Sequence, residues 1–585
     1  MIVTAAAGFI YEAAYKTFRS KRFSSSLPRA RVLRECHFRK SPPSAIIQVS
    51  VQPILGNLRT SASTGNLRRN PLYLIAFLIF FVYAANKLAD YVIGNDMSGL
   101  AYVALSVIVG ASTVAMLNNW RNGLYLFLTW LLFEDLARKY LGNNMAIYFG
   151  KDFLVAIVYI AFFIAWRDKK VATFRFPFRV PLLLFVWFGI MQVFNPAATS
   201  IFYGLMGFKL YFYYIPLMFV GYALIDSEKD LRRLFAISLG LAAVISALGI
   251  AQAILGHTFL NPAHPADDIK DLSQLYRVAP ISGVTIYRPT SVFVSDGRFS
   301  AYLLLALLIA IGFAGYLVLR SRRGRLQAFA GLVLVIGAVA LTGSRGALIW
   351  GVFNAFVASA AFFWGAPWRQ GEAMRIVRTV QRVLLGITVA VVILLFTFPD
   401  ALLDRFTFYN ETLSLDSPSS ELVYRARDYP LQNFVAAFDA PRWPYGYGLG
   451  TASLGTQYVA RIMHAAPMGV GVENGYGEII LEVGIVGLVL WIIMSFSISF
   501  SAWKVVKKMR GSPLFPLAFV IFWYTFIVLV PFTFNGLNTY QNFVMNAYLW
   551  LLIGVLYRLP TLKLMAQASG ETAGASIRQP HTGTH

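Results

Sequence analysis

The sequence predicts an all-α membrane protein, a polytopic bundle of about 12–14 transmembrane helices with a large periplasmic loop capping the exterior face. Of its 585 residues, 57% are hydrophobic and 13% are charged. A soluble chain has roughly 25% charged and about 45–50% apolar residues. The mean hydropathy of +0.60 points the same way. Apolar stretches long enough to cross a bilayer also recur from residue 71 to residue 557.

Crossing the hydrocarbon core takes roughly 17 to 25 helical residues. The stretches that we expect to span lie near residues 71–87, 97–118, 122–137, 148–166, 180–196, 201–225, 234–255, 299–319, 327–343, 346–365, 383–398, 475–501, 514–534 and 539–557. The third stretch is the weakest, because Glu134, Asp135, Arg138 and Lys139 crowd its end.

The distribution of charge predicts the orientation of the chain. If both termini are cytoplasmic, the cytoplasmic tails and loops carry 36 of the 51 Lys and Arg residues but only 8 of the 27 Asp and Glu residues. Membrane proteins place excess Lys and Arg in their cytoplasmic segments. The two longest exterior loops are then residues 256–298 and 399–474. The second is aromatic and rich in glycine, so we expect it to pack on the membrane helices.

We divide the chain into a basic cytoplasmic tail over residues 1–70, a membrane domain over residues 71–558 and a tail over residues 559–585. Both tails are predicted to be disordered. Attraction to anionic lipid accounts for the basic N-terminal tail better than nucleic-acid binding does. The single Cys36 excludes an internal disulfide, and the six His residues form no Cys/His cluster for a metal.

The segment LTGSRGALIW, residues 341–350, is the first candidate site. Gly343 can end one helix in a left-handed conformation, and Ser344 can cap the next. Arg345 would then sit at a helix N-terminus on the exterior face, where free N–H groups and a guanidinium favour phosphate or pyrophosphate. The alternative is an interfacial arginine whose head reaches the lipid headgroups.

Three further cations are candidates. Arg288 and Arg298 lie in YRPTSVFVSDGRFSAYLL, residues 287–304, and one of them could share an anionic ligand with Arg345. The alternative, a solvated loop charge, is favoured for Arg298. Lys209 lies inside a predicted span, so it either marks a binding site or pairs with a structural carboxylate.

Acidic and amide groups occur where the large loop ends, in GVENGYGEIILEVGIVGL, residues 471–488. Glu473 and Asn474 lie at the membrane edge, where a carboxylate can act as a general base and the Asn474 amide is a candidate substrate contact. Glu478 and Glu482 share one face of the following helix. We interpret Glu482 as a packing or hydrogen-bonding residue.

The large loop contributes further candidates. Arg425 and Arg427 could bind an anionic substrate, or they could pair with Asp428 or Glu421. The aromatic side chains of its second half either stack on sugars or pack in the loop; they are Trp443, Tyr445 and Tyr447.

In combination, LTGSRGALI, RPTSVF followed by GRFSAYLLL, PYGYGLGTAS and VENGYGEIILEVGIVGL resemble the bacterial O-antigen ligase and Wzy-type polysaccharide polymerase superfamily. The resemblance covers roughly residues 71–558. It implies a multi-pass glycosyltransferase of the bacterial inner (cytoplasmic) membrane that is inverting, metal-independent and free of cofactors. The donor would be a glycan on undecaprenyl diphosphate. The acceptor would be a lipid-linked glycan in a polymerase or lipid A-core in a ligase, and a flippase and a chain-length regulator are candidate partners.

Carried onto this chain, the resemblance implies that Arg345 and Arg288 bind the pyrophosphate and that Lys209 holds a basic position of its helix. Glu473 stands where the ligases usually have a histidine. This difference favours a polysaccharide polymerase over an O-antigen ligase. The competing class is a transporter of lipid-linked glycans, which we expect to show internal repeats and ionisable groups near the bilayer midplane.

Overall fold

The structure is a computed structural model of the chain. It describes residue 110, residues 112–141, 145–168, 171–262, 275–320, 323–367, short stretches between 381 and 393, and residues 395–413, 424–463 and 471–577.

The protein is a multi-pass helical membrane protein. Eight helical segments among the described residues are long and apolar enough to cross a membrane. They are Ile147–Arg167, Ile201–Leu224, Glu228–Leu255, Asp296–Arg320, Arg345–Gly365, Gly475–Met509, Phe515–Asn535 and Phe543–Leu564.

The predicted fold class is confirmed, and each of these eight segments coincides with a predicted span. Three other predicted spans form helices that fall short of the length or hydropathy needed: α4 (Trp120–Leu141), α6 (Arg179–Val193) and α11 (Arg325–Leu341). The predicted span at residues 71–87, most of that at 97–118 and parts of that at 383–398 lie outside the described residues, as does the predicted tail over residues 1–70.

The remaining elements follow in chain order, with β1 and β2 forming an antiparallel pair. They are α5 (Met145–Arg167), α7 (Ile201–Phe212), α8 (Leu217–Leu224), α9 (Glu228–Leu255), β1 (Tyr276–Val278), β2 (Thr285–Tyr287), α10 (Asp296–Arg320), α12 (Arg345–Gly365), α14 (Pro399–Leu413), η4 (Tyr424–Asp428), α16 (Tyr429–Ala436), η5 (Ala437–Asp439), α17 (Leu454–Met463), α18 (Gly475–Met509), α19 (Phe515–Ile527), η6 (Val528–Phe532), α20 (Thr533–Asn535), α21 (Asn538–Gln541) and α22 (Phe543–Ile577).

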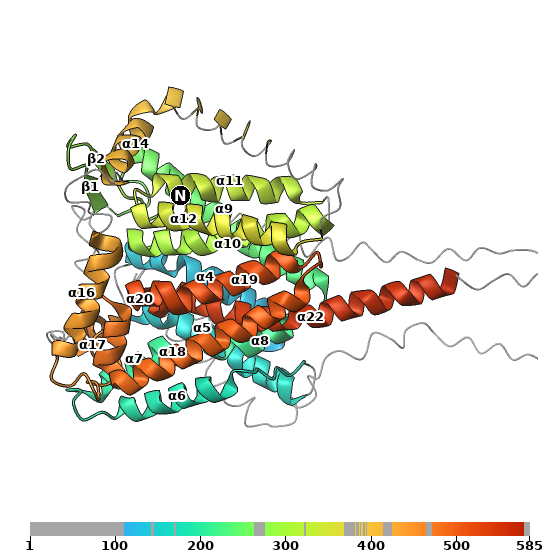
Figure 1. Ribbon diagram of the computed structural model, residues 1–585, viewed down its shortest axis with the longest axis horizontal. Helices are drawn as coiled ribbons and strands as arrows, with labels where there is room; N and C mark the ends of the chain where they lie inside the picture. The colour runs from blue at the N-terminus through green and yellow to red at the C-terminus, as the bar shows by residue number, and fades with distance from the viewer. Residues whose placement is uncertain are drawn as a thin grey trace, which may run out of the picture. The chain divides into compact units, whose positions relative to one another are not determined.

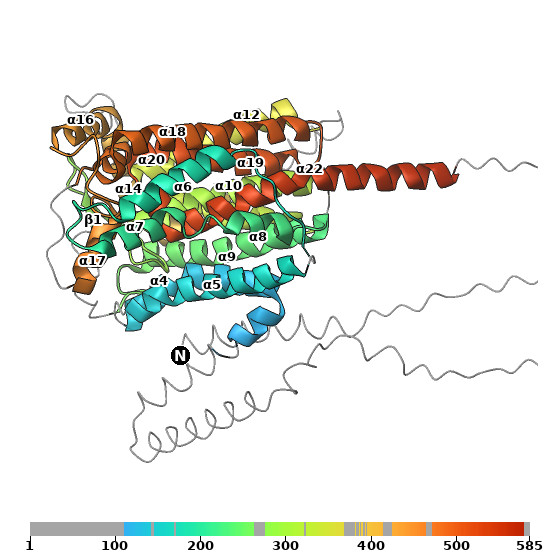
Figure 2. The same ribbon diagram turned by 90° about the horizontal axis from the view of Figure 1, so that it is seen from below.

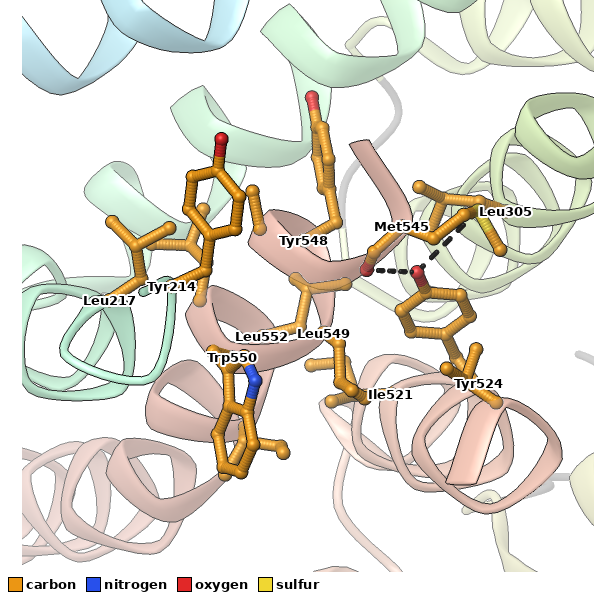
Figure 3. Close-up of a cluster of buried hydrophobic side chains, with 14 of the residues drawn as sticks. Tyr214, Leu217, Leu305, Ile521, Tyr524, Met545, Tyr548, Leu549, Trp550 and Leu552 are labelled. Carbon is orange, nitrogen blue, oxygen red and sulfur yellow. Dashed lines mark hydrogen bonds between the residues drawn. The ribbon is translucent and has the colours of Figure 1, made fainter. Parts of the chain in front are cut away.

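Helix α22 lies at the centre of the bundle and packs against α8, α10 and α19 (Figure 3). Its residues Leu549 and Trp550 are fully buried. The hydroxyl of Tyr524 in this core donates to the carbonyl of Met545 over 2.7 Å. In apolar surroundings an unpaired hydroxyl would cost free energy, so this bond offsets the cost of burying Tyr524.

The connecting elements β1, β2, α14, α16 and α17 gather at one end of the bundle, which we call the cap end (Figures 1 and 2). The described parts of residues 399–474 pack there against the membrane helices, as predicted. Helix α22 projects from the opposite end and stays helical to Ile577, so the tail predicted from residue 559 begins as helix. The cap end carries the candidate residues discussed next.

Candidate functional site

The turn before α12 has the local structure that the sequence predicts. Gly343 has a φ of +66°, which only glycine adopts at little cost. A Cβ atom there would also lie 2.7 Å from Ile286 Cδ1, a side chain of β2. Ser344 caps α12, since its hydroxyl accepts a hydrogen bond from the Ala347 N–H over 3.3 Å. Both predictions for this turn are confirmed, and Arg345 is the first residue of α12.

Three arginines meet at a cavity of about 810 Å³ beside this turn, which we call the arginine pocket. Arg345 comes from α12, Arg288 follows β2, and Arg277 comes from β1. Arg277 pairs with Ile286 in the two-stranded sheet. Because side chains alternate along a strand, Arg277 and Arg288 lie on the same face of the hairpin. The other lining residues are Val278, Pro280, Gly343, Ser344, Gly346, Ile349, Trp350, Phe408, Thr412, Pro531, Phe534 and Asn535.

Arg288 is held by one carboxylate and is close to two like charges. Its guanidinium lies 2.6 Å from Asp296 Oδ2, at the start of α10. Its Nε is buried and has no hydrogen-bond partner among the described residues. Burial lowers the pKa of Arg288, Asp296 opposes that shift, and the neighbouring charges of Arg277 and Arg345 add to it. The arginine pocket therefore gathers three guanidinium groups, one of them paired with Asp296, and this concentration of positive charge favours an anionic group.

The segment that carries Arg288 is fixed by α4 and α9. Ser291 adopts a positive φ of 51°. The Gln252 side-chain oxygen accepts hydrogen bonds from the N–H groups of Thr290 and Ser291, over 2.9 and 2.6 Å. Lys139 Nζ donates to the Thr290 hydroxyl over 2.8 Å and to the Ser291 carbonyl over 2.7 Å. These bonds position Arg288 through a buried backbone.

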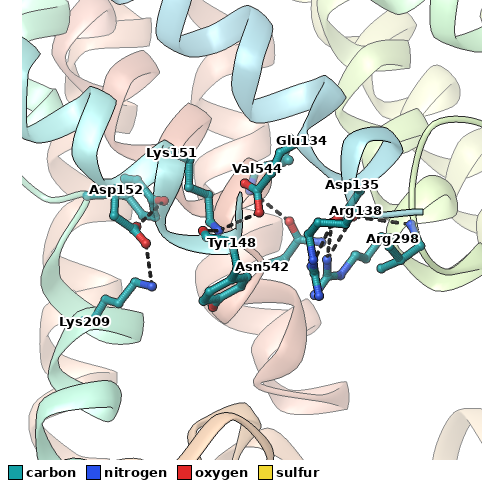
Figure 4. A network of polar contacts seen from close by, with 12 residues as sticks. Glu134, Asp135, Arg138, Tyr148, Lys151, Asp152, Lys209, Arg298, Asn542 and Val544 are labelled. Carbon is teal, nitrogen blue, oxygen red and sulfur yellow. Dashed lines mark hydrogen bonds and ion pairs between the residues drawn. The ribbon is translucent and has the colours of Figure 1, made fainter. Parts of the chain in front are cut away.

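The charges that crowd the end of α4 are buried and paired (Figure 4). Asp135 forms ion pairs with Arg138 over 3.0 Å and with Arg298 over 2.9 Å. Arg298, which the sequence favours as a solvated charge, is thus a structural cation that joins α10 to α4. The same charges make the predicted span at residues 122–137, which forms α4, the weakest of the predicted spans.

Lys209 belongs to the same region and does not line the arginine pocket. Its Nζ lies 2.6 Å from Asp152 Oδ2 and 4.4 Å from the ring centroid of Tyr148 (Figure 4). The neighbouring pair, Lys151 and Glu134, is separated by 3.0 Å. Of the two alternatives for Lys209, the structure shows the pairing with a structural carboxylate.

Arg405 in α14 ties the cap to the membrane helices. It is 5% exposed, and it donates to the carbonyls of Leu341, Ala253 and Tyr287 over 3.1, 3.3 and 3.0 Å. These carbonyls end α11, lie in the last turn of α9 and end β2. Burial lowers the pKa of Arg405. No sequence pattern points to Arg405, which joins α14 to the ends of α9, α11 and β2 beside the arginine pocket.

Glu473 lies in a second cavity of about 800 Å³, which we call the glutamate pocket. The carboxylate of Glu473 accepts a hydrogen bond from the Tyr429 hydroxyl over 2.6 Å, and its backbone N–H donates to Asn433 Oδ1 over 2.9 Å. The remaining lining residues are Pro430, Ala452, Ser453, Leu454, Thr456, Gly471, Val472, Glu478, Asn535, Gly536 and Asn538. Glu473 is therefore an exposed carboxylate oriented by α16.

Asn474 and Glu478 begin the helix that follows. Asn474 is fully buried and caps α18, accepting from the Gly477 N–H over 2.9 Å and donating to the Pro430 carbonyl over 3.0 Å. This placement favours a structural role over the predicted substrate contact. Glu478, one turn later, accepts from the Leu537 N–H over 3.1 Å and lines the glutamate pocket.

Glu482 fastens the loop before α17, in agreement with its interpretation as a hydrogen-bonding residue. Its carboxylate accepts bonds from the Tyr211 hydroxyl over 2.8 Å and from the N–H groups of Ala452 and Ser453 over 3.2 and 2.9 Å. Those contacts place Ser453 at the wall of the glutamate pocket.

Helix α18 is interrupted at Gly484, whose φ is +73° and ψ is −179°. The loop at residues 444–448 uses the interruption: Tyr447 and Gly448 donate to the carbonyls of Leu481 and Glu482 over 2.7 and 2.9 Å, and Ile485 donates to that of Pro444 over 3.3 Å. The glycine-rich loop and the glutamate-rich helix therefore form one unit.

Among the remaining candidates of the large loop, those with described side chains do not line either pocket; they are Arg427, Trp443, Tyr445 and Tyr447. Arg427 is 75% exposed and pairs with Asp428 over 2.6 Å, one of its two predicted alternatives. The side chain of Arg425 lies outside what the structure describes. Trp443 packs on Phe438, with ring centroids 5.2 Å apart, and Tyr445 is 79% exposed.

The arginine and glutamate pockets meet at Asn535, the last residue of α20, which lines both. No sequence pattern pointed to Asn535 or to Arg277, although the alternation of the YRV and TIY segments could have placed Arg277 beside Arg288. Among the described residues, no three His, Cys, Asp or Glu side chains are grouped so that they could hold a metal ion. Neither a family model nor a curated protein matches this chain.

Proposed function

We propose that this protein is a polysaccharide polymerase of the bacterial inner membrane. It transfers a glycan from undecaprenyl diphosphate to a sugar hydroxyl of a lipid-linked acceptor at the periplasmic face. The observation that carries the proposal is the pairing of the arginine pocket, suited to a diphosphate, with the glutamate pocket, which presents an exposed carboxylate. Their shared residue, Asn535, makes them parts of one site.

An apolar cavity of about 430 Å³ supports a lipid-linked donor. It lies between α10, α11 and α12 and is lined by Leu307, Ile311, Leu332, Ile336, Val339, Leu348, Gly351 and Val352, among others. Helix α12 lines both this cavity and the arginine pocket, with Leu348 in one and Ile349 in the other. A polyprenyl chain beside α12 would place its diphosphate at Arg345, where the positive helix N-terminus adds to the guanidinium.

The chemistry is a single displacement. The acceptor hydroxyl oxygen bonds to the anomeric carbon as the bond from that carbon to the diphosphate oxygen breaks, and the configuration inverts. Glu473 accepts the hydroxyl proton. Arg345 and Arg288 stabilise the charge that develops on the departing undecaprenyl diphosphate.

The positions of basic residues support a periplasmic cap end. The helix ends opposite the cap carry Arg167, Arg179, Arg232, Arg233, Arg320, Arg325, Lys504, Lys507, Lys508 and Arg558. This is the distribution that membrane proteins show on their cytoplasmic side. The proposed site therefore faces the compartment where lipid-linked repeats are polymerised.

The test is an assay of purified protein with an undecaprenyl-diphosphate-linked repeat, measuring released undecaprenyl diphosphate and chain length together. Arg345→Ala should lower the rate at least about 100-fold, the typical cost of losing one donor to a developing charge. Arg345→Lys should retain part of the activity, because it keeps the charge but loses the planar fork. Arg442→Ala is the matched control, since Arg442 is an exposed cap residue that lines neither pocket.

Two other functions predict different outcomes. An O-antigen ligase would transfer finished polymer to lipid A-core, so a deletion strain would accumulate long lipid-linked chains rather than single repeats. A transporter of lipid-linked glycans would release no undecaprenyl diphosphate. Full activity of the Arg345→Ala variant would rule out the proposed site.

A further inference from the structure

The lining of the glutamate pocket restricts the acceptor. Its polar side chains are two carboxyl groups, three amides and three hydroxyl groups: Glu473, Glu478, Asn433, Asn535, Asn538, Ser453, Thr456 and Tyr429. Amides and hydroxyls both donate and accept hydrogen bonds, which suits the hydroxyl groups of a sugar. No basic side chain that the structure describes lines this pocket.

The charge of the pocket comes from Glu473, which is exposed, and its second carboxyl group, Glu478, is 7% exposed. Glu473 lies on the pocket wall beside Tyr429, its hydrogen-bond partner. A sugar carboxylate placed there would meet Glu473, and none of the described lining residues supplies a cation to offset the repulsion. Like charges brought together at a binding surface discriminate strongly against the wrong ligand.

The arginine pocket increases this discrimination. It presents Arg277, Arg288 and Arg345 on the other side of Asn535. An acidic acceptor would be drawn to these arginines and would compete there with the donor diphosphate. A neutral acceptor, or one with an amino group, has no such competing position.

We propose that the acceptor sugar bound in the glutamate pocket is neutral or carries an amino group, and that the pocket discriminates against acidic sugars. This inference rests on the proposed function, because it takes the glutamate pocket as the acceptor side of the transferase. It assigns the substrate class of that side from the side chains that line it.

The experiment measures binding without turnover, using purified protein in lipid nanodiscs. The probes are p-nitrophenyl glycosides in the gluco, galacto and manno series, each as the neutral sugar, the 2-amino sugar and the uronic acid. The members of a series share their ring stereochemistry. We expect, in at least one series, neutral and amino sugars to bind at least about tenfold more tightly than the uronic acid.

Variants of the pocket test whether its charge sets the preference. Glu473→Gln should bring the affinity for the uronic acid to within about threefold of that for the neutral sugar. Asn538→Lys, which adds a cation to the lining, should raise the affinity for the uronic acid. Arg442→Ala should leave the preference as it is in the wild type.

Equal or tighter binding of uronic acids would overturn the inference, and so would an absence of binding in all three series. If uronic acids bind tightly and Arg425→Gln removes that binding, the segment that carries Arg425 sets the selectivity. This outcome would also overturn the inference. The expected preference without any transfer from a lipid-linked donor would contradict the polymerase proposal alone.

Discussion

Buried cations in this protein differ in how they are satisfied. Arg138 and Arg298 are matched by Asp135, and Arg405 is matched by three backbone carbonyls. The arginine pocket has three guanidinium groups, and Arg288 bears an Nε without a partner in the described structure. Groups of the first kind hold helices together, whereas the arginine pocket gathers three guanidinium groups around one cavity.

Replacement of Arg405 tests its role as a brace. Arg405→Met removes the donor from three carbonyls that lie in the interior. Each buried polar group left unsatisfied costs about 1–3 kcal/mol. We expect a clear drop in the midpoint of thermal unfolding of the detergent-solubilised protein, measured by fluorescence-detected size exclusion.

Arg442→Met supplies the control, since it removes an exposed arginine from the same cap. Equal midpoints for the two variants would show that the Arg405 contacts do not stabilise the junction.

Among the elements, the interrupted helix α18 defines the shape of the glutamate pocket. The break at Gly484 frees the carbonyls of Leu481 and Glu482 for the loop that carries Gly446 and Tyr447. A Cβ atom on Gly484 would lie 2.5 Å from the Pro444 carbonyl oxygen. Glycine is needed here for two reasons, the dihedral angles and the close approach of the loop.

Gly484→Ala should therefore destabilise the protein and distort the glutamate pocket. A residue other than glycine at these dihedral angles costs about 1–3 kcal/mol before the clash with Pro444 is counted. The measurement is the thermal midpoint together with affinity for a neutral glycoside. Gly240→Ala in α9 is the control, because a Cβ there meets nothing within 4 Å; a drop of the same size in both variants would contradict the argument.

Some elements of the site could be predicted from the sequence because they depend on neighbouring residues alone. The turn formed by Gly343, Ser344 and Arg345 is one of these elements, because the residues that end and begin helices can be recognised from the local sequence. Arg405 and Asn535 could not be found, because their roles depend on chain segments far away in the sequence. The partners of Arg405 are 64 to 152 residues distant. The position of Asn474 beside Glu473 in the sequence predicts a site residue, and only the fold shows that it caps α18.

In the part of the chain that the structure describes from residue 112 onward, successive long helices alternate in direction, so that the two pockets and the hairpin share one end of the bundle and the basic helix ends share the other. Hydropathy and the distribution of Lys and Arg predict this alternation well, because each span is recognised by its own apolar length and each loop by its own charge. The prediction is weakest for α4, where Glu134 and Asp135 lower the hydropathy, and the sequence does not show that they pair with charges from α5 and α10.

The orientation makes a prediction for intact cells. In a Cys36→Ser background, Tyr445→Cys places a thiol at a cap position that is 79% exposed, and Leu326→Cys places one at the opposite end, 84% exposed. With the outer membrane permeabilised, a maleimide that cannot cross the inner membrane should label the first and spare the second. Leu326→Cys should react only after lysis, and the reverse pattern would contradict a periplasmic site.

The paired charges of α4 also bear on how the chain is made. Asp135 acquires its partner Arg298 only 163 residues later, and Lys139 acquires Ser291 152 residues later. Until α10 is made, Asp135 has Arg138, three residues away, as its partner, but lacks the second cation, Arg298. We expect the polar end of α4 to complete its packing only after α10 has been synthesised, and a chain truncated before Arg298 to leave these contacts unmade.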